Sequence, residues 1–185
     1  MKGNIEVICG SMFSGKTTEL ISKLQNAKKR KKTVIVFKPS IDSRYHKKSV
    51  VSHDGKSIPC LTVNNPLNII KLSKDADVVG IDEAQFFNEE LISICNNLAN
   101  TGKKVIISGL NMDSSGIPFG IMPQLLAIAE KITKKYAICE SCKAKANFSY
   151  RKNKNKNTIL IGEQKEYAAL CRECFKKKSF DRKKH

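Results

Sequence analysis

The chain has 185 residues, of which 41% are hydrophobic, and this suits one packed domain with a smaller appendage. No apolar stretch is long enough to cross a bilayer and no signal peptide precedes the first strand, so a cytoplasmic protein without a membrane partner is expected. The formal charge is +17, but Lys outnumbers Arg by 29 to 5, and base reading favours Arg. We therefore expect no specific nucleic-acid partner.

A phosphate-binding loop follows the first apolar run. Residues 5–9 are predicted to form a buried strand, and apolar residues at helical spacing begin at Leu20. The backbone N–H groups of a glycine loop between a strand and a helix converge on phosphate, together with the helix dipole. In this pattern Lys16 reaches the outer phosphates and the Thr17 hydroxyl holds Mg²⁺. The alternative is a glycine turn that only joins strand to helix. The loop consists of Gly10, Ser11, Met12, Phe13, Ser14, Gly15, Lys16 and Thr17.

A second buried strand, predicted at 33–37, completes a βαβ unit with the helix that ends in the basic run 28–32. The polar stretch 38–56 that follows is typical of a functional loop. Within it, Arg44 lies just past the second strand, where a guanidinium can neutralise charge on a transferred phosphoryl group. An ordinary solvated loop arginine is an equally good interpretation of this spacing.

Two acidic residues end the next predicted strand, 77–81, which follows a short helix at 65–72. Downstream of a P-loop, Asp82 is placed to position a magnesium-bound water, and Glu83 to accept a proton from an attacking hydroxyl. The alternative is that both acids cap the next helix. The P-loop upstream favours catalysis.

The rest of the first domain continues the alternation of strands and helices. Helices are predicted around 91–98 and 125–130, and strands at 103–109 and 131–137, with a loop at 110–120. This order predicts an α/β fold, a P-loop parallel sheet flanked by helices, with ligands at the carboxyl ends of the strands.

Two C-x-x-C pairs organise the C-terminal part of the chain. Four thiolates match a closed, structural zinc site, while four unliganded reduced cysteines are the alternative. The spacer 143–170 is predicted to be an excursion with strands at 146–151 and 158–162, either a lid or a plain solvated hairpin. We therefore expect a domain at 1–137, a zinc-binding domain at 138–178 and a disordered basic tail at 179–185. The zinc ligands are Cys139, Cys142, Cys171 and Cys174, and the other cysteines, Cys9, Cys60 and Cys95, are expected in the core.

Taken together, the P-loop, the Asp42-Ser43-Arg44-Tyr45 loop, the Asp82-Glu83-Ala84-Gln85-Phe86-Phe87 motif, Pro118-Phe119-Gly120 and the paired cysteines resemble the type II thymidine kinases. The likeness runs in order from about residue 3 to residue 178.

The resemblance implies transfer of the γ-phosphoryl group of MgATP to the 5′-hydroxyl of thymidine, and of deoxyuridine, with Glu83 as the proton acceptor. It implies a lasso-like loop that closes over the base, a homotetramer and inhibition by thymidine triphosphate. By this resemblance ATP binds the P-loop together with Asp82, Glu83, Ala84 and Gln85. The implied substrate-binding residues are Met12, Phe86, Leu110, Phe119, Ser149, Thr158, Ile159, Leu160, Ile161, Gly162 and Tyr167, with Arg151 as a further lasso position.

One segment departs from the family pattern. Where the family commonly has an aromatic residue and a basic residue before Pro-Phe-Gly, this chain has Ser114 and Ser115. Because an aromatic contact is worth on the order of 1 kcal/mol beyond burial, weaker thymidine binding or altered base tolerance is expected.

Two other functions compete with this interpretation. One is a basic P-loop ATPase whose zinc domain holds nucleic acid, and the other is a nucleotide-binding regulator without catalysis. Nucleic-acid-stimulated ATP hydrolysis marks the first, and tight ATP binding without turnover marks the second.

Overall fold

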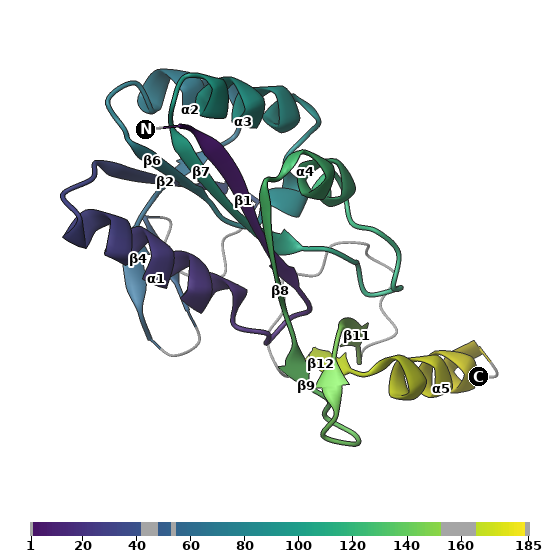
Figure 1. The fold of residues 1–185 in the computed structure, drawn as a ribbon. Helices are drawn as coiled ribbons and strands as arrows, with labels where there is room; N and C mark the ends of the chain where they lie inside the picture. Colours follow the sequence, from purple (N-terminus) through teal and green to yellow (C-terminus); the bar gives the residue numbers. More distant parts are fainter. Residues whose placement is uncertain (1, 42–47, 53–54, 153–165, 184–185) are drawn as a thin grey trace.

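The computed structural model describes residues 2–41, 48–52, 55–152 and 166–183. Its centre is a six-stranded sheet in which every neighbouring pair of strands is parallel (Figure 1). The parallel α/β sheet that the alternating strands and helices predicted is therefore confirmed. Across the sheet the strands are β5 (Leu61–Val63), β2 (Val34–Pro39), β6 (Val78–Ile81), β7 (Lys104–Leu110), β1 (Asn4–Gly10) and β8 (Lys131–Lys135).

Helices cover both faces of this sheet. The helix α1 (Lys16–Lys29) packs its buried residues Leu20, Ile21 and Leu24 on one face. The other face carries α2 (Leu67–Leu72), α3 (Glu90–Asn100) and α4 (Met122–Ile128) (Figure 1). The apolar stripe of α3, which includes Leu91 and Leu98, is almost fully buried there. Two apolar layers thus fix the carboxyl edge of the sheet as a rigid platform.

The second part of the chain is a small C-terminal module, residues 137–152 and 166–183, which lies beyond the carboxyl ends of β1 and β8 (Figure 1). It contains two antiparallel pairs and the helix α5 (Arg172–Lys183). The pairs are β9 (Ala137–Ile138) with β10 (Lys145–Ala146), and β11 (Phe148–Arg151) with β12 (Tyr167–Leu170).

The predicted strand 131–137 is divided in two. Its first part is β8 at the edge of the main sheet, and Ala137 already belongs to the module through its pairing with Ala146. The division falls at Tyr136, so the chain leaves the sheet where the module begins.

The prediction of a disordered tail is wrong for residues 179–183, which continue α5. The segment has few apolar residues, so its periodicity was not visible. Its first turns are held instead by Phe175, whose ring stacks on Phe148 at a centroid distance of 4.6 Å. Once its first turns are anchored, a helix can continue through a polar segment whose residues have high helix propensity, and lysine is such a residue.

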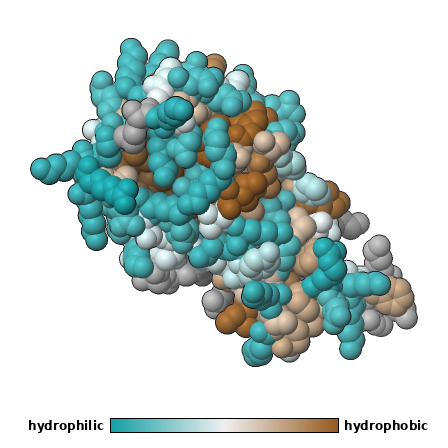
Figure 2. All heavy atoms as spheres, in the orientation of Figure 1, coloured by the Kyte–Doolittle hydropathy of each residue, from teal (hydrophilic) through white to brown (hydrophobic). Residues whose placement is uncertain are grey.

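The polar stretch 38–56 also contains structure. β3 (Ser49–Val51) pairs with β4 (Ser57–Pro59) in a hairpin whose buried residues Val50 and Ile58 join the core beneath α1. Hydrophilic side chains dominate the visible face of the larger lobe (Figure 2). Among the helices that the structure describes, none has the length and apolar character required to span a bilayer.

Candidate active site and metal centre

The loop after β1 has the geometry that a phosphate-binding loop requires. A Cβ on Gly10 would lie 2.3 Å from the carbonyl oxygen of Lys135, so only glycine fits this approach between β1 and the end of β8. Gly15 precedes α1 with φ +78° and ψ 24°, a left-handed conformation that glycine adopts without strain. Ser11 O accepts hydrogen bonds from Lys16 Nζ at 2.8 Å and from Ser14 Oγ at 2.7 Å. The lysine therefore lies over its own loop, and half-buried Thr17 follows it in the first turn of α1.

The position of α1 is fixed by a buried acid in β1. Glu6 exposes 1% of its surface, and Lys23 Nζ of α1 lies 3.1 Å from one of its carboxylate oxygens. Burial raises the pKa of Glu6, but the hydrogen bond and charge of Lys23, with the charges of Lys104 and Lys131, outweigh it and hold the pKa below its usual value. Lys23 also pairs with Glu19 of the same helix at 3.0 Å, and Glu19 in turn pairs with Lys135 of β8 at 3.4 Å, so ion pairs join the helix that begins at the P-loop to two strands of the sheet.

The predicted acidic motif lies at the same edge of the sheet. Asp82 directly follows β6 and is 5% exposed, and its N–H donates to Phe37 O of β2 at 2.9 Å. Glu83 is half-buried and has φ 52° and ψ 43°, a left-handed conformation uncommon for a residue with a long side chain. Beyond it the 3₁₀ turn η1 spans Ala84–Phe86, so the chain turns abruptly after the strand instead of entering a long helix. Glu83 occupies the N-cap position of η1, but its side chain makes no capping hydrogen bond there, so the geometry does not favour the interpretation of Glu83 as a helix cap.

Gln85 connects the acidic motif to the next strand of the sheet. Its side chain is 3% exposed, and Nε2 donates a short hydrogen bond to Glu83 Oε2. Its Oε1 accepts from Leu110 N–H, at the end of β7, at 2.9 Å. A buried amide that uses both ends in this way fixes the direction of the Glu83 carboxylate. The sequence contained the motif, but nothing in it indicated this bridge.

Several residues expected to surround the base lie together at this edge. Phe86 and Phe119 make an edge-to-face contact with a centroid distance of 5.5 Å. Leu110 pairs with Gly10 in the parallel ladder, which places the end of β7 beside the start of the P-loop. The structure thus places Leu110 beside the P-loop, and Phe119, whose N–H donates to Asn111 O at 3.2 Å, just beyond the end of β7.

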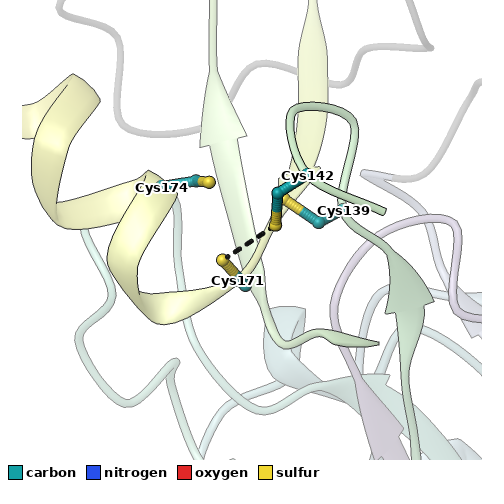
Figure 3. Close-up of side chains that lie close together, drawn as sticks. All are labelled: Cys139, Cys142, Cys171 and Cys174. Carbon is teal, nitrogen blue, oxygen red and sulfur yellow. Dashed lines mark hydrogen bonds between the residues drawn. The ribbon is translucent and has the colours of Figure 1, made fainter. Parts of the chain in front are cut away.

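The four cysteines of the two C-x-x-C pairs converge between the β9–β10 turn and the start of α5 (Figure 3). Their sulfur atoms all lie within 4.8 Å of one another, and the Cys142 and Cys171 sulfurs are 3.6 Å apart. Tetrahedral zinc with Zn–S bonds of about 2.3 Å requires sulfurs roughly 3.8 Å apart. The donor set and its spacing therefore fit zinc with all four positions filled by protein.

The electrostatics of the cluster agree with this donor set. Burial opposes ionisation of Cys139, but the N–H groups of Cys171, Cys142 and Ser141 lower the pKa of its thiol to about 6. Hydrogen bonds with Cys171 and Cys142 raise the pKa of the Cys174 thiol to about 12. Close sulfurs share protons in this uneven way, and a thiolate-binding cation replaces those protons. The remaining cysteines, Cys9, Cys60 and Cys95, are buried core residues as predicted.

The C-terminal module contacts the P-loop directly. Ser149 Oγ of β11 accepts a hydrogen bond from Met12 N–H at 2.9 Å, and Ser11 Oγ donates to Ala146 O at 3.3 Å. Tyr167 is 7% exposed, and its hydroxyl accepts from Arg151 Nη2 at 3.1 Å. The ring of Tyr167 and that of Phe13 line a common cavity of about 450 Å³ between loop and module. Of the expected lasso positions, Ser149, Arg151 and Tyr167 are thus placed near the loop.

Some predicted residues lie outside the described part of the chain. These are Arg44 and the whole segment Thr158, Ile159, Leu160, Ile161 and Gly162.

The sequence prediction also missed one buried charge at the site's edge. Lys38, the residue after Phe37 in β2, is 2% exposed, and its Nζ lies 3.4 Å from Ser49 O. A lysine placed directly at the end of a buried strand was the available signal.

These features define a class of protein: a P-loop nucleotide-binding α/β domain that carries acidic residues at the sheet edge and a module whose four clustered cysteines fit a metal ion. The family model for thymidine kinase matches residues 3–175. A thymidine kinase of Bacteroides fragilis is 52% identical over 176 residues, which cover 95% of this chain and 88% of that protein. One of Bacteroides thetaiotaomicron is 53% identical over 174 residues, covering 94% and 87%, and one of Porphyromonas gingivalis is 50% identical over 176 residues, covering 95% and 86%. The chain belongs to the thymidine kinase family.

Proposed function

We propose that this protein transfers the γ-phosphoryl group of ATP to the 5′-hydroxyl of thymidine, and of deoxyuridine, to form the monophosphate for DNA synthesis. The observation that carries the proposal is the shared edge of the sheet. Glu83, fixed by Gln85, lies on the same edge as a loop built to hold phosphate. Family membership supplies the substrate class, because the relatives that match nearly the whole chain are thymidine kinases.

In this proposal ATP binds along the P-loop, with its phosphates at the N–H groups before α1 and with Ala84 and Gln85 in the nucleotide-binding segment. Lys16 and Arg44 stabilise the charge that develops on the transferred group. Thr17, and Asp82 through a water, would hold Mg²⁺, and the ion would supply positive charge to the phosphate oxygens. The burial of Asp82 at the end of β6 supports a role in which its carboxylate is held in one position.

The protein's own chemical step is the removal of one proton. The 5′-oxygen forms a bond to the γ-phosphorus while the bond from that phosphorus to the bridging oxygen of ADP breaks, and the proton of the hydroxyl passes to Glu83. Phosphoryl transfer depends mostly on positioning and electrostatics. The Gln85 bridge matters here because it limits the orientations available to Glu83.

The thymine base is placed against Met12, Phe86, Leu110 and Phe119, and beneath the lasso positions Thr158–Gly162 and Tyr167. The edge-to-face contact of Phe86 with Phe119 supports an apolar, aromatic wall at this place. Zinc at the four cysteines closes the base of the module and has a structural role, because a site filled by four thiolates has no open position for substrate. A cytoplasmic homotetramer that is inhibited by thymidine triphosphate completes the proposal.

One substrate panel tests the proposal. Purified protein is incubated with labelled ATP and each common deoxynucleoside, and the monophosphates are separated. Thymidine and deoxyuridine are expected to be phosphorylated, and Lys16→Ala and Glu83→Gln are each expected to lower turnover by at least about a hundredfold in folded protein. ATP hydrolysis that is stimulated by DNA or RNA, without formation of a deoxynucleoside monophosphate, refutes the proposal. An active Glu83→Gln enzyme refutes the assignment of Glu83 as the base.

A further inference from the structure

Three successive residues of the P-loop are attached to the C-terminal module. Ser11 Oγ donates to Ala146 O, and Met12 N–H donates to Ser149 Oγ. The half-buried ring of Phe13 packs against the core of the module. More than 130 residues separate the partners of each hydrogen bond along the chain. The tip of the nucleotide loop is therefore shaped by the far end of the sequence. The module core consists of Ala137, Cys139, Ala146, Ala168, Ala169 and Leu170.

These contacts are shielded from water. Ser11 exposes 2% of its surface and Ser149 exposes 3%. Met12 is half-buried and its acceptor Ser149 is buried, so the bond from Met12 N–H to Ser149 Oγ favours one conformation of the loop. Phe13 adopts φ 63°, which a bulky residue keeps only when its surroundings hold it there. The packing of Phe13 on the module provides such surroundings.

We infer that the C-terminal module positions the ATP-binding loop, and that Ser149 is a positioning residue for ATP. The Met12 N–H donates to Ser149 Oγ, so this hydrogen bond holds the backbone of the loop at Met12 against β11. Ser11 O is the acceptor for Lys16 Nζ, so a shift of Ser11 and Met12 moves the lysine expected at the outer phosphates. The position of the Lys16 side chain therefore depends, through Ser11 and Met12, on the contact between the P-loop and β11.

The inference rests on the proposed ATP site at the P-loop and adds a second duty to the metal-binding module. The buried thiol of Cys139 belongs to the same core cluster that Phe13 contacts. If the cysteines become disordered, the packing of Phe13 on this cluster changes, and the conformation of the nucleotide loop changes with it. No contact between a cysteine and ATP is needed for this effect. A module that only covers the thymine base would have no effect on ATP binding when thymidine is absent.

The test compares Ser149→Ala with Ser149→Thr in the full zinc-loaded protein. Binding of a non-hydrolysable ATP analogue is measured by calorimetry without thymidine, and hydrogen exchange is measured at the Met12 amide. We expect Ser149→Ala to lower the affinity for the ATP analogue by about tenfold and to raise the hydrogen-exchange rate of the Met12 amide. Ser149→Thr keeps the acceptor, and its methyl group faces the small cross-strand partner Ala169, so binding is expected to return toward the wild-type value.

Ser73→Ala is the matched control, because Ser73 is a fully buried serine whose hydroxyl donates to Ile69 O at the end of α2, away from the loop. It is expected to leave analogue affinity and Met12 exchange unchanged. Ser11→Ala, which breaks the bond to Ala146 from the loop side, replaces Ser149→Ala if that variant does not fold, and the same loss is expected. Unchanged analogue affinity and unchanged Met12 exchange in a folded variant overturn the inference. If Lys16→Ala also binds the analogue normally, the proposed ATP site itself is refuted.

Discussion

Replacement of Gln85 separates the orientation of Glu83, the proposed catalytic base, from the binding of the substrates. The Gln85 side chain is 3% exposed and makes two hydrogen bonds, one to Glu83 and one from the N–H of Leu110 at 2.9 Å. Gln85→Met keeps the length and volume of the side chain and loses both bonds. Gln85→Glu keeps an oxygen acceptor for Leu110 but turns a carboxylate toward Glu83 in place of the donor.

The expected loss follows from the kind of bond. A hydrogen bond to an ionised group is worth about 1.5–3 kcal/mol. If that energy no longer favours the productive direction of Glu83, kcat falls by about 10- to 100-fold. For Gln85→Met, the unpaired Leu110 N–H lowers the free energy of unfolding by a further ~1–3 kcal/mol.

Steady-state kinetics with thymidine and ATP, together with urea denaturation, measure both effects. Both variants are expected to lose kcat by a similar factor, and the affinity for a non-hydrolysable ATP analogue is expected to stay within about twofold of wild type. Parallel loss of analogue affinity would instead indicate the direct contact between Gln85 and ATP that the family resemblance implies. A Gln85→Glu enzyme with the wild-type kcat would refute the reasoning, because the donor to Glu83 would then be dispensable.

Three further predictions concern other parts of the chain. Cys174→Ser is expected to lower zinc from one ion per chain toward none in elemental analysis and to lower the melting temperature, and an unchanged zinc content contradicts the assigned site. Ser114→Phe is expected to lower KM for thymidine about fivefold, because an added aromatic contact is worth about 1 kcal/mol; an unchanged KM means that Ser114 does not face the base. Glu6→Gln is expected to destabilise the protein by about 2 kcal/mol at pH 7. Burial raises the Glu6 pKa but Lys23 lowers it further, so this stability is present above the ordinary value of 4.5 and is lost as pH falls through the folded-state pKa. Denaturation curves measured between pH 7 and pH 3 for wild type and Glu6→Gln check this prediction. If the free energies of unfolding of the two proteins fall in parallel over this range, the prediction is contradicted.

Local patterns were sufficient to predict most of the sheet and the P-loop. The buried runs became β1, β2, β6 and β7, because strands covered on both faces by helices must be apolar throughout. The spacing of the glycines predicted the loop, and Gly15 has the left-handed φ of 78° that the turn into α1 requires. The edge strand β5 was missed, since only one of its three residues is buried and such a short run has no periodic signal.

Local sequence patterns do not predict contacts between segments that are distant in the chain. These contacts determine how the site is assembled. A short motif indicates which residue types occur together, but Gln85 gains its role only when β7 brings the N–H of Leu110 to it. Ser149 likewise reads as an ordinary strand residue until the end of β8 carries the module onto the P-loop. The close approach of Gly10 to the Lys135 carbonyl fixes the point where the chain leaves the sheet, and thereby where the module begins. The steric requirement of Gly10 thus links the P-loop to the start of the module that contains the four clustered cysteines.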